Sequence, residues 1–211
     1  MRLFVALELP DLVCGELWAE CQGALQPTAG LRVSDATLWH ITLAFFGEVD
    51  ESLLERLGTR LQRAAARHPA LTLRLAGAGQ FGGHVLWAGV RGEVAGVRRL
   101  ADSVAACGRR EGLVVEQRRY RPHVTLARSS RPADLRPNVE AIGEWQSATL
   151  APRFAIRCLR RGSWLTEALP NTCARSRTWI SAAVVGTPVR FRSPARTLRG
   201  GRRVRPGSSF R

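Results

Sequence analysis

The stretch Trp39-His40-Ile41-Thr42-Leu43 recurs in the second half of the chain as Pro122-His123-Val124-Thr125-Leu126. Both copies are rich in β-forming residues, and on a strand the side chains at positions i and i+2 point to the same face. Each copy is therefore expected to present one imidazole and one hydroxyl together, with aliphatic side chains on the opposite face. Two such strands in one chain predict two related lobes, each of which supplies half of a central cleft.

Strands and helices interleave around both copies of the motif. Runs of β-forming and apolar residues predict strands at residues 2–9, 37–46, 71–75, 85–90, 120–127, 154–159 and 178–185. Apolar residues at helical spacing predict helices at residues 12–21, 53–64 and 93–110. The glycines Gly77, Gly79, Gly82 and Gly83 predict a loop between the third and fourth strands.

The composition is that of a folded protein with a strongly basic surface. Of the 211 residues, 45% are hydrophobic and 23% are charged, which suits one domain or two small lobes that share a core. The formal net charge is +15, and all 32 basic residues are arginine. Such a surface attracts polyanions, nucleic acid above all, through contacts that salt weakens, although charge alone names no partner.

The two ends of the chain differ in character. From residue 187 to residue 211 the composition shifts to Arg, Pro, Gly and Ser, which cannot bury enough apolar surface to offset chain entropy. We therefore predict a folded domain over residues 1–186 and a disordered basic tail over residues 187–211. The first residues enter a strand-like pattern at once, which is not typical of a signal peptide.

Cysteine usage and hydropathy indicate a cytoplasmic location. The five cysteines are scattered and include no Cys-x-x-Cys pair, so they are expected to be reduced thiols rather than zinc ligands or disulfides. No apolar run approaches the roughly 20 residues that a membrane-spanning helix needs. We expect a cytoplasmic monomer with no membrane segment.

The residue types of the motif suit phosphodiester chemistry without a metal or cofactor. One histidine can take a proton from an attacking water while the other gives one to the departing oxygen, because an unperturbed imidazole pKa near ~6.5 makes both protonation states available. The threonine hydroxyls can donate hydrogen bonds to phosphoryl oxygens. A lone histidine on a strand is most often structural, but two such motifs in a chain with four histidines favour catalysis. His68 and His84 lack the following threonine and are expected at the surface.

The motifs and their flanks resemble a known family. The resemblance rests on four segments: Arg2-Leu3-Phe4-Val5-Ala6-Leu7, Trp39-His40-Ile41-Thr42-Leu43-Ala44-Phe45-Phe46-Gly47-Glu48, Val85-Leu86-Trp87-Ala88-Gly89-Val90 and Tyr120-Arg121-Pro122-His123-Val124-Thr125-Leu126-Ala127-Arg128. They are similar to the RNA 2′,3′-cyclic phosphodiesterases of the two-histidine phosphoesterase superfamily, historically also named 2′-5′ RNA ligases. The resemblance extends to about Ile180. It weakens near there, because the family's closing Gly-Pro-x-Tyr turn is replaced by Leu169-Pro170-Asn171-Thr172-Cys173.

The resemblance implies a fold, a reaction and roles for four residues. The fold would be α+β and bilobal, with two pseudo-symmetric lobes, antiparallel sheets around a central cleft and helices on the outside. The reaction would be hydrolysis of an RNA 2′,3′-cyclic phosphate end to a 2′-phosphomonoester. His40 would be the proton donor to the 3′ oxygen, His123 would be the proton acceptor that activates water, and Thr42 and Thr125 would hold the phosphate.

Two arginines beside the second motif are further candidates for substrate binding. Arg121 precedes His123 by two residues, so on a regular strand it shares the catalytic face. Arg128 follows Leu126 by two residues and would lie on the opposite face unless a twist or a bulge turned it. Alternation alone therefore favours Arg121 over Arg128. The aromatic run Phe45-Phe46 is expected to pack in the core rather than to form a surface for base stacking.

Three alternatives to hydrolysis of RNA ends remain open at the level of sequence. Ligation of a cyclic phosphate to a 5′-hydroxyl would use the same residues with an alcohol in place of water. A non-catalytic RNA-binding module is disfavoured by the intact histidines and threonines of both motifs. A small cyclic phosphodiester is a third option, since the motifs recognise the phosphate and specify little else.

Overall fold

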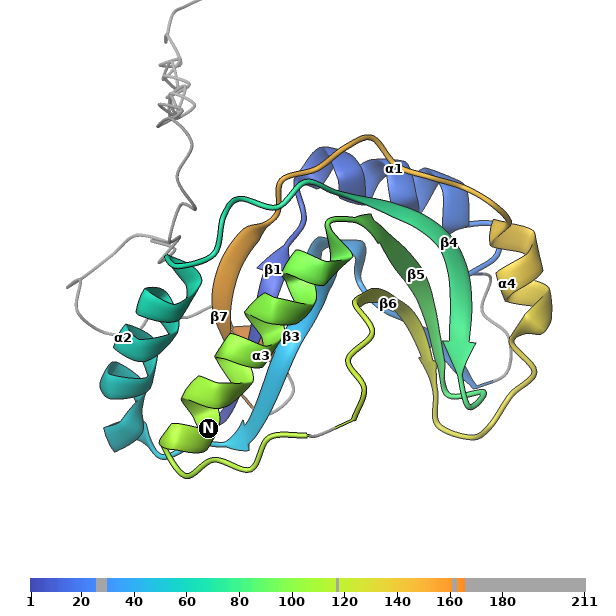
Figure 1. The fold of residues 1–211 in the computed structure, drawn as a ribbon. Helices are drawn as coiled ribbons and strands as arrows, with labels where there is room; N and C mark the ends of the chain where they lie inside the picture. Colours follow the sequence, from blue (N-terminus) through green and yellow to red (C-terminus); the bar gives the residue numbers. More distant parts are fainter. Residues whose placement is uncertain (26–29, 117, 161–162, 166–211) are drawn as a thin grey trace, which may run out of the picture.

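The structure of the protein is a computed structural model that describes residues 1–25, 30–116, 118–160 and 163–165 (Figure 1). The strand expected at residues 178–185 and the basic tail expected at residues 187–211 lie outside the described residues. The boundary expected at residue 186 lies outside them as well.

Eight strands and four α-helices follow one another along the described residues, with two short 3₁₀ helices between them. Their order is β1 (Arg2–Glu8), α1 (Asp11–Cys21), β2 (Leu31–Val33), η1 (Ala36–Leu38), β3 (His40–Glu48), η2 (Glu51–Leu53), α2 (Leu54–Ala65), β4 (Leu73–Phe81), β5 (Val85–Gly92), α3 (Val94–Arg110), β6 (His123–Ser129), α4 (Arg136–Ile142), β7 (Arg153–Arg160) and β8 (Ser163–Leu165). The three predicted helices are confirmed as α1, α2 and α3. Six of the predicted strands correspond to β1, β3, β4, β5, β6 and β7.

Short elements and glycines account for the differences from the sequence-based expectation. Strand β2 and helix α4 were not predicted, because three and seven residues are too few to show a period. Strand β4 continues through Gly77 and Gly79, where breaks were expected. A register shift at Gly77 bends the strand without ending it, whereas Gly82 and Gly83 adopt φ values of 55° and 72° in the turn that follows.

The sheet is antiparallel and bends into two lobes. Its strand order is β4-β5-β6-β3-β1-β7-β8, with β2 pairing separately with β6. Strands β3, β1 and β7 form one lobe and strands β6, β5 and β4 form the other, on the two arms of the arch in Figure 1. This is the expected α+β fold with two lobes and external helices.

The helices connect the lobes because two of them cross from one lobe to the other. Helix α3 follows β5 but packs on β3 of the first lobe, and α2 packs against α3 there. Helix α1 follows β1 but lies with α4 beside the second lobe (Figure 1). Buried side chains from both lobes consequently belong to one continuous apolar core.

Within the described ranges, no helix is long and apolar enough to cross a membrane. The described thiols Cys14, Cys21 and Cys107 are free. Burial raises the pKa of Cys14 to about 11 and that of Cys21 to about 12, so both stay protonated at neutral pH.

Close packing of α3 on β3 can be tested with a matched pair of glycine substitutions. A Cβ at Gly108 of α3 would lie 2.4 Å from Cε1 of Phe46, whereas a Cβ at Gly15 of α1 would meet nothing within 4 Å. Alanine favours a helix interior by about 0.5–1 kcal/mol over glycine, but overpacking a core costs about 1–3 kcal/mol. Thermal unfolding should therefore show a higher Tm for Gly15→Ala and a lower Tm for Gly108→Ala. A rise in Tm for both would contradict the packing described.

Candidate active site

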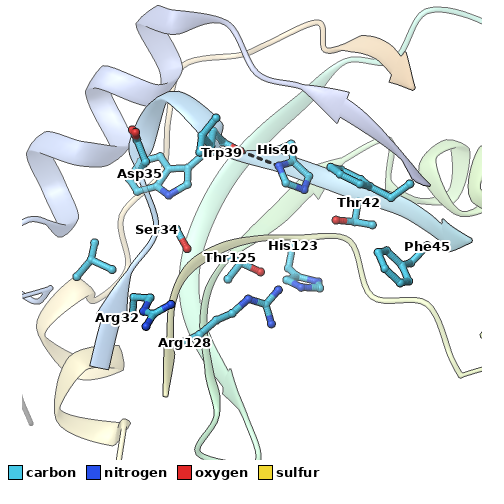
Figure 2. Close-up of a pocket in the computed structure, with 13 residues that line it drawn as sticks. Arg32, Ser34, Asp35, Trp39, His40, Thr42, Phe45, His123, Thr125 and Arg128 are labelled. Atoms are coloured by element: carbon cyan, nitrogen blue, oxygen red, sulfur yellow. Dashed lines mark hydrogen bonds between the residues drawn. The ribbon is translucent and has the colours of Figure 1, made fainter. Parts of the chain in front are cut away.

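A pocket of about 570 Å³ opens where the two lobes meet, and both motif histidines line it (Figure 2). His40 and Thr42 come from β3, and His123 and Thr125 come from β6. The volume lies in the range of small-molecule sites. The structure therefore brings together all four residues that the motif singled out.

The relative position of the two motifs follows from the pairing of their strands. Strands β3 and β6 are antiparallel, and Ile41 is the register partner of Val124. Continuing this register places His40 opposite Thr125 and Thr42 opposite His123. The two motifs are thus related by a pseudo-twofold axis through the Ile41–Val124 pair, and this register places each histidine across the two strands from the threonine of the other motif.

A hydrogen bond fixes the orientation of each imidazole in the same way. The Nδ1 atom of His40 lies 2.7 Å from the carbonyl oxygen of Leu38, and Nδ1 of His123 lies 2.7 Å from the carbonyl oxygen of Arg121. A carbonyl can only accept, so Nδ1 of each ring carries the hydrogen. In the neutral ring Nε2 then holds the lone pair, and it is the nitrogen available for proton transfer.

Aromatic side chains from other strands of the sheet pack near both imidazoles. The ring of Phe4 on β1 lies 5.0 Å from that of His40, and the ring of Phe81 on β4 meets that of His123 edge-on at 5.0 Å. Trp87 lies 6.3 Å from His123, with its indole against Gly79 on the adjacent strand. A side chain at Gly79 would collide with the indole, which explains a glycine inside β4. The two rings are consequently held by packing as well as by hydrogen bonds.

Both histidines are less basic than a free imidazole. Burial lowers the pKa of His40 from 6.5 to about 4, and the positive charges of Arg157, Arg128 and His123 act in the same direction, against its bond to Leu38. Burial also lowers the pKa of His123, helped by Arg128 and opposed by the bond to Arg121. Unlike the unperturbed rings assumed from the sequence, both imidazoles are mainly neutral near pH 7 in the protein without substrate.

A bulge in each motif strand turns a further side chain into the pocket. In β6 the register shifts so that Ala127 pairs with Leu86 and Thr125 pairs with Trp87, which leaves an extra residue between them. Arg128 therefore lines the pocket, as the arginine beside His123 in Figure 2. A corresponding shift in β3 brings Phe45 into the pocket with 42% of its surface exposed, whereas Phe46 is buried as expected.

The expectation that favoured Arg121 over Arg128 is corrected by this geometry. Strand β6 begins only at His123, so strand alternation does not extend back to Arg121. Arg121 is exposed and does not line the pocket, and its contribution is the carbonyl oxygen that His123 contacts. Phe45 was likewise expected in the core but offers an accessible ring on which a base can stack.

Two further contacts near the site join residues far apart in the sequence, and sequence reasoning missed both. The hydroxyl of Tyr120 donates to the carbonyl oxygen of Thr42 at 2.9 Å, and burial raises the pKa of that phenol. Arg157 on β7 donates to Glu8 on β1 from two nitrogens, at 2.8 Å and 3.2 Å, and both side chains are about nine-tenths buried. No local pattern signals either contact, because each depends on how the strands pair.

The other histidines of the chain lie away from the pocket. His68 contacts the Ser103 hydroxyl at 2.9 Å, and His84 contacts the Ser129 carbonyl oxygen at 3.2 Å. In the part of the chain that the structure describes, no cluster of three His, Cys, Asp or Glu side chains is placed to hold a metal ion.

Comparisons with known proteins agree on the family. The chain matches the model of the 2′-5′ RNA ligase superfamily over residues 10–161. It is 35% identical over 136 residues to the RNA 2′,3′-cyclic phosphodiesterase of Escherichia coli (strain K12), which is 63% of this chain and 74% of that relative. It is 37% identical over 158 residues to the protein of the same name from Thermus thermophilus, or 69% and 77% of the two chains. The crystal structure of E. coli LigT complexed with 3′-AMP has a TM-score of 0.60 at 28% identity, covering 78% of this chain and 92% of that one.

The low pKa of His40 predicts a pH-dependent contribution to stability. Above pH 6.5 the ring is neutral in both the folded and unfolded states, and below it only the unfolded state takes up a proton readily. Stability is therefore lost as pH falls from 6.5 to about 4, by about 2–3 kcal/mol. Denaturant unfolding of wild type and His40→Gln should show the wild type losing stability relative to the variant across this range. A difference that is independent of pH would contradict the burial of a neutral ring.

Proposed function

The chain belongs to the 2′-5′ RNA ligase superfamily, and we propose that it hydrolyses the 2′,3′-cyclic phosphate at the end of an RNA strand to a 2′-phosphomonoester. The observation that carries the proposal is the placement of two histidines and two threonines around one pocket, on two antiparallel strands that pair at Ile41 and Val124. The curated relatives from E. coli and T. thermophilus are RNA 2′,3′-cyclic phosphodiesterases. The protein is accordingly a hydrolase of phosphodiester bonds.

In the proposed mechanism the two imidazoles stand on opposite sides of the phosphorus atom. The lone pair on Nε2 of His123 accepts a proton from a water molecule, whose oxygen forms a bond to phosphorus. The bond from phosphorus to the 3′ oxygen breaks, and Nε2 of protonated His40 gives its proton to that oxygen. The products are a 3′-hydroxyl and a 2′-phosphate, and the two rings end in exchanged protonation states.

The threonine hydroxyls complete the phosphate site in this proposal. Thr42 and Thr125 lie on the same face as the histidines, where their hydroxyls can donate to the two non-bridging oxygens. Negative charge grows on these oxygens as water attacks, so donors fixed in advance stabilise the transition state more than the ground state. Arg128 adds a positive charge at the pocket wall.

The low pKa of His40 requires that substrate binding protonate it. A cyclic phosphate carries a negative charge, and an opposite charge within about 4–6 Å favours the charged form of a titratable group. Binding of the phosphate therefore offsets the burial and the nearby arginines that keep His40 neutral in the free protein. The proton donor is formed mainly in the complex.

The wider setting is proposed on the same grounds. Both lobes that line the pocket belong to one chain, which suits a monomer as the active unit. A net charge of +15 suits RNA as the substrate, and free thiols suit the cytoplasm. No step of the mechanism calls for a metal or a cofactor.

Product analysis in the presence of a chelator tests the proposed function. An RNA oligonucleotide ending in a 2′,3′-cyclic phosphate, incubated with the protein and EDTA, should give a 2′-phosphomonoester by phosphorus NMR at the same rate as without EDTA. Water at about 55 M competes with any 5′-hydroxyl for the activated position, so hydrolysis should dominate. A 3′-phosphate product, a joined strand as the main product, or a rate that chelation abolishes and a divalent metal restores would each contradict the proposal.

A further inference from the structure

Two arginines from neighbouring strands lie side by side at the pocket. Arg32 on β2 is the register partner of Arg128 on β6, so the two side chains project from neighbouring positions on the same face of the sheet. Both are exposed, and both line the pocket that holds the histidines. In Figure 2, Arg32 lies at the side of the pocket away from Phe45, with Arg128 between Arg32 and His123.

In the part of the chain that the structure describes, Arg32 has no carboxylate as an ion-pair partner. Like charges directly opposite one another on paired strands destabilise a sheet. Among the described residues, neither Arg32 nor Arg128 takes part in a salt bridge. The nearby Asp35 instead accepts hydrogen bonds from the Thr37 backbone N–H at 2.9 Å and the Thr37 hydroxyl at 2.7 Å.

A second pair of opposed arginines elsewhere in the fold shows that the pairing alone does not make a site. Arg74 on β4 and Arg91 on β5 are also register partners, and both are exposed. Neither of them lines the pocket. Arg32 differs from them because both it and its partner Arg128 line the pocket that contains the two imidazoles.

An anionic group of the substrate fits the position of Arg32. The cyclic phosphate is already held between the two histidines and the two threonines in the proposed mechanism. Strand β2 pairs with the same edge of β6 as β3 but further along it, since Ile41 of β3 pairs with Val124 and Arg32 of β2 pairs with Arg128. Four residues of strand separate these two pairs, or roughly 13 Å, so Arg32 is placed for a different phosphate from the one that reacts. In an RNA strand the next phosphate is the phosphodiester that joins the terminal nucleotide to the one before it. A mononucleoside cyclic phosphate has no such group.

We propose that Arg32 binds the phosphodiester on the 5′ side of the terminal nucleotide and so makes the protein selective for cyclic phosphates at the ends of RNA chains over cyclic mononucleotides. The inference rests on the proposed function and specifies its substrate class. A guanidinium presents a planar fork of N–H donors that matches two phosphate oxygens. The bound phosphate would also neutralise the repulsion between Arg32 and Arg128. Because only the RNA chain carries this phosphate, the contact raises kcat/KM for the chain end and not for the cyclic mononucleotide.

Selectivity between two substrates tests the inference. One substrate is a dinucleotide that ends in a 2′,3′-cyclic phosphate, and the other is the mononucleoside 2′,3′-cyclic phosphate with the same base. The ratio of kcat/KM for the first to kcat/KM for the second is measured at one salt concentration for wild type, Arg32→Ala, Arg32→Lys and Arg91→Ala. Hydrogen bonds to charged groups contribute about 1.5–3 kcal/mol, so Arg32→Ala should lower the ratio roughly 10- to 100-fold. Arg32→Lys should restore part of it.

The Arg91→Ala variant is the matched control, because it removes an equal charge from an equivalent opposed pair outside the pocket. Its ratio should equal that of wild type. An unchanged ratio in Arg32→Ala, or an equal fall in Arg91→Ala, would overturn the inference while leaving hydrolysis itself intact. If wild type hydrolyses neither substrate, the proposed function fails and the inference fails with it.

Discussion

The pairing of Ile41 in β3 with Val124 in β6 joins the two lobes of the sheet, and the geometry of the site depends on it. Both side chains are fully buried on the apolar face, which fixes the parity of each strand. A slip of one residue in either strand would turn its histidine and threonine away from the pocket. This register therefore brings the histidines of the two His-x-Thr motifs to the same pocket.

The bulges in β3 and β6 are the second structural requirement of the site. In both strands the bulge follows the motif threonine, and it turns Phe45 in one strand and Arg128 in the other toward the pocket. Equivalent positions in the two lobes thus place an aromatic ring at the pocket from one lobe and a guanidinium from the other. The reacting groups come from equivalent positions, while the differences between the lobes lie in the residues that surround the substrate.

The sequence predicts the parts of this account that have a period or a repeated motif. Helices α1, α2 and α3 show apolar residues at helical spacing, and the four motif residues share a face by simple alternation. Bulges break alternation without a residue signature of their own, which is why Arg121 was favoured over Arg128. Strand β2, which carries Arg32, is too short to show a pattern. The buried pair of Glu8 and Arg157 depends on strands from opposite ends of the described chain.

The central claim is that His40 and His123 act as a unit on one phosphate, and the kinetics of the single and double alanine variants test it most directly. Each single substitution should lower kcat on cyclic-phosphate RNA by about 10²–10⁴, the usual effect of removing a positioned acid or base. His84→Ala, outside the pocket, is the control for loss of an imidazole. The double variant should be only slightly slower than either single variant, because one histidine without the other cannot complete the proton transfer. A double variant whose loss equals the product of the two single losses, or a single variant that keeps nearly full activity, would contradict the account.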